Sequence, residues 1–186
     1  MAASSAKRVV KKKREVGEDL YEQPGHLIRR AHQIAQGMFD EHVGREVTPI
    51  QYAILRMVHE IPGIDQVGLA KRIALDTSTT ATAAARLEGK GLLTRSVVET
   101  NRRQLQLHLT ADGEKLLDGL VQGVHRMRSE LLGALEPDER EHFIELLRKF
   151  VHVNNEQSRA PLQMPQAPDD TPPPAAGARP ARRTRG

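Results

Sequence analysis

Apolar residues recur every three or four positions over two segments in the first third of the chain. Over residues 24–43 they form a single stripe, which predicts an amphipathic helix. Thr48 is a preferred N-cap residue and Pro49 suits the first position of a helix, so a second helix is expected from there to about Glu60. The positions expected to face inward on this second helix are Ile50, Ala53, Ile54, Met57 and Val58.

Two shorter helical segments follow one another closely. The first covers about residues 66–72, and Asp76 is placed to cap the second, which runs from Thr77 to about Gly89. The interior positions of this second helix are small, so it can pack closely on its neighbours. Two short helices joined by a tight turn are typical of a helix-turn-helix.

The period of the pattern changes from helical to alternating over residues 92–109. Leu105, Leu107 and Leu109 alternate with polar residues, which predicts a pair of strands. Residues 99–103 are then expected at the tip of the hairpin. A helix-turn-helix followed by such a hairpin predicts a mainly α fold, a winged helix-turn-helix with a two-stranded wing.

Two further helices complete the pattern. Thr110 is the expected N-cap of a long helix that reaches about Leu135. Residues 136–138 are expected to turn the chain into a last helix, whose apolar stripe holds Phe143, Leu146, Leu147, Phe150 and Val151. Both carry a strong apolar stripe although they lie far along the chain from the helix-turn-helix. A chain of 186 residues has little of its own to cover these stripes, so we expect them to form a homodimer.

Composition separates the ends of the chain from its middle. Residues 1–19 carry a net charge of +3, and residues 159–186 carry the same net charge and seven of the eleven prolines. Both ends are expected to be disordered tails, which leaves residues 20–158 as the folded part. Within it we predict a DNA-binding lobe over residues 48–110 and dimerisation helices over residues 20–47 and 111–158.

Several classes of protein are excluded by what the sequence lacks. Without cysteine, the chain offers no disulfide, no thiolate zinc site and no thiol redox switch. It has no apolar run near the ~20 residues of a membrane span and no signal peptide, so a cytoplasmic protein is expected. The eight histidines lack metal-ligand spacing, and no nucleophile motif or phosphate-binding loop is present. We therefore expect no metal, no cofactor, no catalytic residue and no enzyme activity.

The predicted DNA-binding lobe has a positive net charge and side chains that suit binding in the grooves of DNA. Residues 65–110 carry a net charge of +3 and residues 111–158 one of −4, so the positive charge follows the proposed lobe. Small hydroxyls can reach base edges, and arginines can bind phosphates or a narrow minor groove. The residues expected to contact double-stranded DNA are Ser78, Thr79, Thr82, Arg86, Arg102 and Arg103. The alternative is that serine and threonine only start the helix and that the arginines are solvated.

Three stretches of the chain resemble the MarR family of bacterial transcription regulators. They are the run from Leu69 to Leu93, which ends in Leu-Glu-Gly-Lys-Gly-Leu-Leu, the tripeptide Asn101-Arg102-Arg103, and the segment from Leu105 to Gly113. The resemblance covers roughly residues 24–155. It departs from the family at Asn101, where aspartate is frequent, and at Thr82, where arginine is common. These departures bear on a salt bridge in the wing and on the choice of operator.

The resemblance implies a dimer in which the first helix and the last two helices interlock. It also implies a small aromatic acid bound between the first two helices, the long helix and the winged domain. The candidate ligand-binding residues are Arg29, Arg30, His32 and Tyr52, because a cationic side chain can pair with a carboxylate. His32 shares a helical face with Ile28 and Phe39, so it is expected to point inward. The alternative is an ordinary interior histidine, with arginines that are solvated or paired across the dimer.

These features together predict a dimeric, sequence-specific transcription regulator. We expect a repressor that binds an inverted-repeat operator and leaves it when a small aromatic carboxylate binds. The alternative is a non-sensing winged-helix or architectural protein that uses its basic tails on DNA. A response of DNA binding to aromatic acids separates the two.

Overall fold

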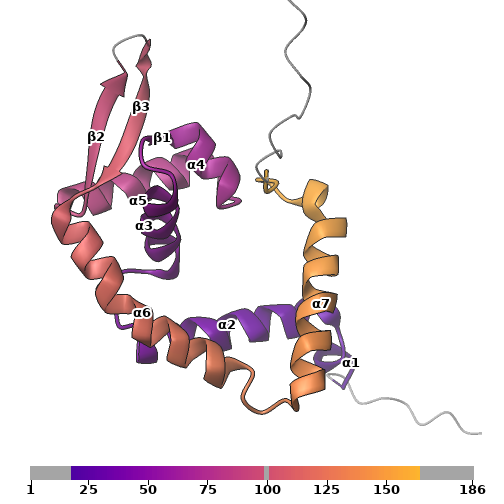
Figure 1. Ribbon diagram of the computed structural model, residues 1–186. Helices are drawn as coiled ribbons and strands as arrows, with labels where there is room; N and C mark the ends of the chain where they lie inside the picture. Colours follow the sequence, from indigo (N-terminus) through magenta and orange to yellow (C-terminus); the bar gives the residue numbers. More distant parts are fainter. Residues whose placement is uncertain (1–17, 99–100, 164–186) are drawn as a thin grey trace, which may run out of the picture.

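The computed structural model describes residues 18–98 and 101–163, and it confirms the predicted order of helices and hairpin (Figure 1). The four helices before the hairpin are α2 (Pro24–His42), α3 (Pro49–Glu60), α4 (Gln66–Arg72) and α5 (Thr77–Gly89). Helices α3, α4 and α5 gather beside the hairpin at one end of the molecule (Figure 1). Most of each predicted tail lies outside the described residues.

Side-chain caps fix where these helices begin. Thr48 and Gln51 form a reciprocal capping box, in which Thr48 Oγ1 accepts from the backbone N–H of Gln51 at 3.2 Å and Gln51 Oε1 accepts from that of Thr48 at 3.1 Å. The carboxylate of Asp65 caps α4 by accepting from the backbone N–H of Val67 at 2.9 Å. Asp76 caps α5 in the same way, by accepting from the N–H of Thr79 at 2.8 Å.

The sheet has three antiparallel strands, where the sequence predicts two. β2 (Leu93–Val98) and β3 (Asn101–Leu109) form the wing, and β1 (Ile64–Asp65) pairs with the other edge of β3. A strand of two residues is too short to show an alternating pattern in the sequence. It is recognised as a strand only by its pairing with β3 in the folded protein. Strand β3 begins at Asn101, which corrects a second expectation: the backbone of residues 102 and 103 belongs to the strand and not to the hairpin turn.

The C-terminal part also differs in detail from the prediction. α6 (Ala111–Leu131) ends before Leu135, and α7 (Pro137–Val153) follows a turn in which Arg140 donates to the backbone oxygen of Leu135 at 2.7 Å. Two short elements at the margins were not expected. They are α1 (Glu18–Tyr21), which begins before the predicted boundary of the folded part, and the 3₁₀ turn η1 (Asn155–Gln157).

The hydrophobic core lies in the winged lobe and reaches only the first half of α6. Its most buried side chains include Ile54, Leu69, Leu87 and Leu107, each fully buried. Ile50, which the pattern places inward, is instead 39% exposed. Helix α7 contributes no buried side chain, and large apolar residues of α2 are also exposed. The chain by itself therefore covers the apolar surface of one lobe and leaves that of the other open.

Glycines allow α6 to approach two segments of backbone. A Cβ atom added at Gly113 would clash with the backbone oxygen of Leu92, and one added at Gly123 would clash with that of His42. Beside this second crossing, His42 Nε2 lies 3.0 Å from a carboxylate oxygen of Glu130. Helix α6 thus connects the winged lobe to the end of α2.

Candidate nucleic-acid interface and ligand cleft

Helix α5 has one buried and one accessible face. Thr80, Ala84 and Leu87 are buried against the rest of the winged lobe. Three of the predicted DNA contacts on this helix, Ser78, Thr82 and Arg86, are exposed, and Thr79 is half-buried. The structure therefore presents the four predicted residues of α5 together on the accessible side of one helix.

Asp76 organises the hydroxyls at the start of this face. Ser78 Oγ donates to one oxygen of its carboxylate at 2.6 Å, and Thr79 Oγ1 donates to the other at 2.7 Å. The hydrogen bond from Ser78, followed by those from Thr79, holds the pKa of Asp76 well below its usual range. The cap is thus a charged carboxylate that fixes two neighbouring hydroxyl groups. The sequence pointed to the cap and to the hydroxyls, but not to the bonds between them.

The third hydroxyl of the face is also engaged as a donor. Thr82 Oγ1 donates to the backbone oxygen of Ser78 at 2.9 Å. A hydroxyl has one proton to donate and two lone pairs to accept with. Each of the three hydroxyls, of Ser78, Thr79 and Thr82, already donates its proton within the protein. To an approaching molecule they can therefore act only as hydrogen-bond acceptors.

The wing is joined to the end of α5 by an ion pair that sequence reasoning missed. Arg95 on β2 donates from Nε to a carboxylate oxygen of Glu88 at 2.7 Å. The Arg95 guanidinium lowers the pKa of Glu88. The separation of these two residues along the chain gives no helical or turn signal, so only the folded wing reveals the pair. The side chains of Arg102 and Arg103, the predicted wing contacts, lie outside the described residues.

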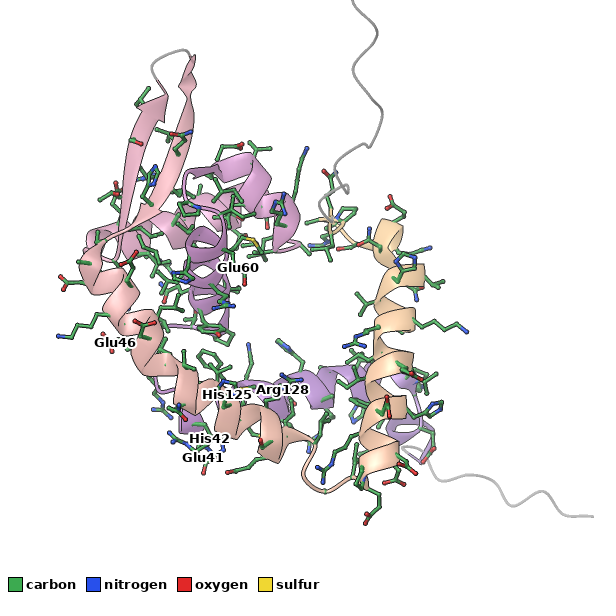
Figure 2. All side chains as sticks on the ribbon, in the orientation of Figure 1. Glu41, His42, Glu46, Glu60, His125 and Arg128 are labelled. Carbon is green, nitrogen blue, oxygen red and sulfur yellow. The ribbon has the colours of Figure 1, made fainter. Side chains whose placement is uncertain are left out.

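A cleft of about 1070 Å³ opens between α2, α3, α6 and α7. The rings of Phe39 and Tyr52 meet on its wall with centroids 6.1 Å apart and planes at 60°. His125, Arg128 and Arg148 also line it. Figure 2 labels His125 and Arg128 on α6, in the region where that helix runs beside α2. The cleft therefore combines aromatic walls with arginine side chains, and the carboxylates of Glu141 and Glu145 line it as well.

The predicted ligand residues are not all brought to this cleft. Tyr52 lines it, whereas Arg29, Arg30 and His32 are exposed on α2 and are absent from its lining. Arg29 donates to Gln33 Oε1 within the same helix at 3.0 Å. His125 and Arg128 were missed because they lie on the long sixth helix, far along the chain from Tyr52. No group of three or more potential metal ligands occurs in the described residues, and none of the described helices could cross a bilayer.

Comparison with known proteins identifies the family. The sequence profile of the MarR family matches residues 47–105. The transcriptional regulator HosA of Escherichia coli O157:H7 is 34% identical over 128 residues, which cover 66% of this chain and 94% of HosA. The chain belongs to the MarR family. It is thus a DNA-binding transcription regulator of the winged-helix type, as the resemblance in the sequence implied.

Solved structures of MarR-family regulators share the fold. PcaV of Streptomyces coelicolor, in complex with its natural ligand, superposes with a TM-score of 0.70 and 34% identity over 74% of this chain and 97% of PcaV. BpsR of Bordetella bronchiseptica superposes with a TM-score of 0.64 and 30% identity over 68% of this chain and 96% of BpsR. The latter structure concerns the regulation of DNA binding by 6-hydroxynicotinic acid.

Proposed function

We propose that this MarR-family protein is a dimeric repressor that reads an inverted-repeat operator with two copies of α5. The observation that carries the proposal is the accessible face of α5, where Asp76 holds two hydroxyls on a helix whose other face is anchored in the core. A rigid polar helix of this kind suits the major groove, which admits an α-helix and displays a distinct pattern for each base pair.

The hydroxyls are proposed to read base edges as acceptors. Each of the three hydroxyls donates its proton within the protein and keeps lone pairs with which it can accept: Ser78, Thr79 and Thr82. In the major groove the exocyclic amines of adenine and cytosine are the donors. We therefore expect the operator to place such an amine opposite these hydroxyls. Replacing an operator adenine with purine, which lacks the amine, should weaken binding of the native protein but not of Thr79→Val.

The arginines are proposed to hold the backbone and the minor groove. Arg86 is exposed on the same face of α5, where it can reach a phosphate. Arg102 and Arg103 are proposed to enter the minor groove from the wing, where negative potential is enhanced. Replacing either wing arginine with alanine should weaken binding to all sequences and reduce the salt slope by about 1.

A second copy of the chain is proposed to cover the apolar surface of the C-terminal helices. Six large apolar side chains of α7 are between 42% and 65% exposed in the single chain: Phe143, Leu146, Leu147, Phe150, Val151 and Val153. Side chains of this size gain about 1.5–3 kcal/mol each on full burial, so their number favours a stable interface. Two-fold symmetry then sets two recognition helices against half-sites about one helical turn apart, ~10 bp.

The cleft is proposed to take a small aromatic carboxylate, the chemical class to which the ligand of BpsR belongs. Phe39 and Tyr52 offer apolar walls, and Arg128 or His125 offers a partner for the carboxylate. Arg29, Arg30 and His32, the other predicted ligand residues, stay a prediction from the sequence, because they are exposed on α2 and do not line this cleft. Such an acid would weaken DNA binding if it bound best to a dimer whose two α5 helices do not match the half-site spacing. A coupling free energy of ~1–3 kcal/mol between the two binding events corresponds to a loss of about 5- to 150-fold in affinity.

The decisive experiment combines operator selection with a ligand panel. An operator selected from random duplexes is expected to be an inverted repeat, and its affinity is measured by fluorescence anisotropy. Benzoates, hydroxybenzoates and pyridine carboxylates are then added at up to millimolar concentration. At least one acid should weaken binding, and Arg128→Ala should respond less to it than Arg126→Ala, a control on an exposed residue of the same helix that does not line the cleft. If no acid changes the affinity, the protein is the non-sensing DNA-binding alternative; if no sequence is selected, the regulatory function itself is wrong.

A further inference from the structure

We propose that residues 154–163, here termed the C-terminal strap, tie α7 to the helix-turn-helix and thereby fix the position of the recognition helix relative to the dimerisation helices. The proposal rests on the proposed function, because a fixed position matters only if two recognition helices must match two half-sites. It assigns a role to a segment that follows the last long helix and whose second half, residues 159–163, the sequence places in the predicted C-terminal tail. In Figure 1 this segment runs from the end of α7 toward α4.

The strap has a defined structure of its own. Asn155 holds the backbone of Leu162 from both sides: its Oδ1 accepts from the Leu162 N–H at 2.8 Å, and its Nδ2 donates to the Leu162 oxygen at 3.2 Å. Ser158 Oγ accepts from the N–H of Ala160 at 3.2 Å within the loop that these bonds close. The strap is thereby folded back on the end of α7.

An apolar groove lies beside these hydrogen bonds. Leu162 is half-buried and lines a groove on α7 together with Ile144, Leu147 and Val151. These residues lie at helical spacing on α7, so one side chain from the strap can meet a whole stripe. The strap therefore moves with α7.

The far end of the strap reaches the helix-turn-helix. The backbone N–H of Gln163 donates to the backbone oxygen of Lys71 at 2.9 Å. Lys71 lies in the last turn of α4, where carbonyl groups lack partners within the helix. Its would-be partner, the N–H of Leu75, bonds instead to the oxygen of Ala70. The strap thus completes the cap of α4, directly before the turn that leads to α5.

This link closes a ring in the fold. One connection between the winged lobe and α7 runs through α6, and the strap supplies the other. Because α7 contributes no buried side chain to the single chain, its position relative to the winged lobe has little other support within the described residues. Loss of the strap is therefore expected to let the winged lobe pivot about α6, which broadens the range of half-site spacings that the dimer accepts.

The test removes the hydrogen bond from the Gln163 N–H to the Lys71 oxygen and controls separately for loss of the Gln163 side chain. Gln163→Pro has no backbone N–H, whereas Gln163→Ala keeps it, so the two form a matched pair. Asn155→Ala opens the clamp on Leu162, and Asn154→Ala is its control, since the side chain of Asn154 donates to the backbone oxygen of Phe150 on α7, at 2.8 Å. Full-length variants are measured by anisotropy against the selected operator and against operators whose half-site spacing is changed by one or two base pairs.

Gln163→Pro and Asn155→Ala are expected to lose about threefold to tenfold in affinity for the preferred spacing, the worth of one hydrogen bond, and to discriminate less between spacings. Their thermal unfolding and dimer mass should match those of the controls, which separates the effect from loss of folding. If Gln163→Pro keeps both the affinity and the spacing preference of Gln163→Ala, the strap has no positioning role. If neither the native protein nor Gln163→Ala binds an operator, the proposed function is wrong. That result differs from a failure of the strap proposal, in which both proteins bind the operator and Gln163→Pro binds it equally well.

Discussion

Ala74 shows how one residue can carry strain at a functional turn. It lies between α4 and α5 and has a φ of 53°, in the left-handed region that favours glycine. The N–H of Leu75 bonds to the oxygen of Ala70 at 3.0 Å and holds the chain in this conformation. The turn that sets the angle between α4 and α5 is therefore made at a cost to the stability of the winged lobe.

Ala74→Gly is expected to raise the free energy of unfolding by about 0.5–1 kcal/mol, because glycine relieves the left-handed strain. The larger conformational entropy of glycine in the unfolded chain offsets the rest of the gain. Ala85→Gly is the control, since Ala85 is exposed within α5 and glycine there should cost about 1 kcal/mol. Urea denaturation measures both. Equal destabilisation by the two substitutions would contradict the argument.

Asp76, the N-cap of α5, makes the stability of the folded protein depend on pH. Hydrogen bonds from Ser78 and Thr79 depress its pKa in the folded state, so its contribution to stability is present above the unfolded value near 3.8 and is lost as the pH falls toward the lower folded value. Asp76→Ala should therefore unfold at a lower temperature than the native protein at pH 6, and the difference should shrink below about pH 4. Thermal unfolding followed by circular dichroism tests this. A difference that stays constant down to pH 2 would show that the charge of Asp76 is not involved.

At the scale of elements, α6 connects the two lobes because glycine lets it touch backbone. Gly123 lies where a Cβ atom would meet the carbonyl oxygen of His42, whereas Gly119 on the same helix has no atom within 4 Å of that position. The two glycines therefore differ in role although they lie one turn apart. The close approach fixes where α2 ends relative to α6.

Gly123→Ala should lower the free energy of unfolding by about 1–3 kcal/mol, because α6 or α2 must shift to admit the methyl group. Gly119→Ala should raise it by about 1 kcal/mol, since alanine is the better helix former and meets no obstacle. Chemical denaturation of the two variants under the same conditions compares them directly. A gain in stability for both would mean that the crossing tolerates a side chain.

At the scale of the whole molecule, the apolar surface is divided unequally between two lobes. The winged lobe buries its own core, while large apolar side chains of α7 are exposed in the single chain. Val151 on α7 and Val97 on the wing are almost equally exposed, at 51% and 53%. Exposure alone thus does not distinguish an interface residue from a surface residue.

Val151→Glu should weaken the dimer, because a charge introduced into an apolar interface is buried in both copies at once. Light scattering should give about twice 20.7 kDa for the native protein and for Val97→Glu. For Val151→Glu the dimer should dissociate at a protein concentration at least about tenfold higher than for the native protein. A native protein that is monomeric at micromolar concentration would overturn the dimer and, with it, the inverted-repeat operator.

The sequence by itself determined the features that depend on neighbours a few residues apart. Helical and alternating periods placed α2 to α5 and the wing, and the caps at Thr48 and Asp76 fixed where helices begin, since each cap bonds to the next turn of its own helix. The polar face of α5 followed from the same local spacing.

Only the tertiary structure decided the contacts between residues distant along the chain. β1 exists because β3 lies beside it, and a two-residue strand has no period to read. The cleft joins Tyr52 to Arg128, and the strap joins Gln163 to Lys71, across separations that no local pattern encodes. The physical reason is that periodicity reports which side of an element is buried, whereas the partner on that side is set by how the whole chain packs.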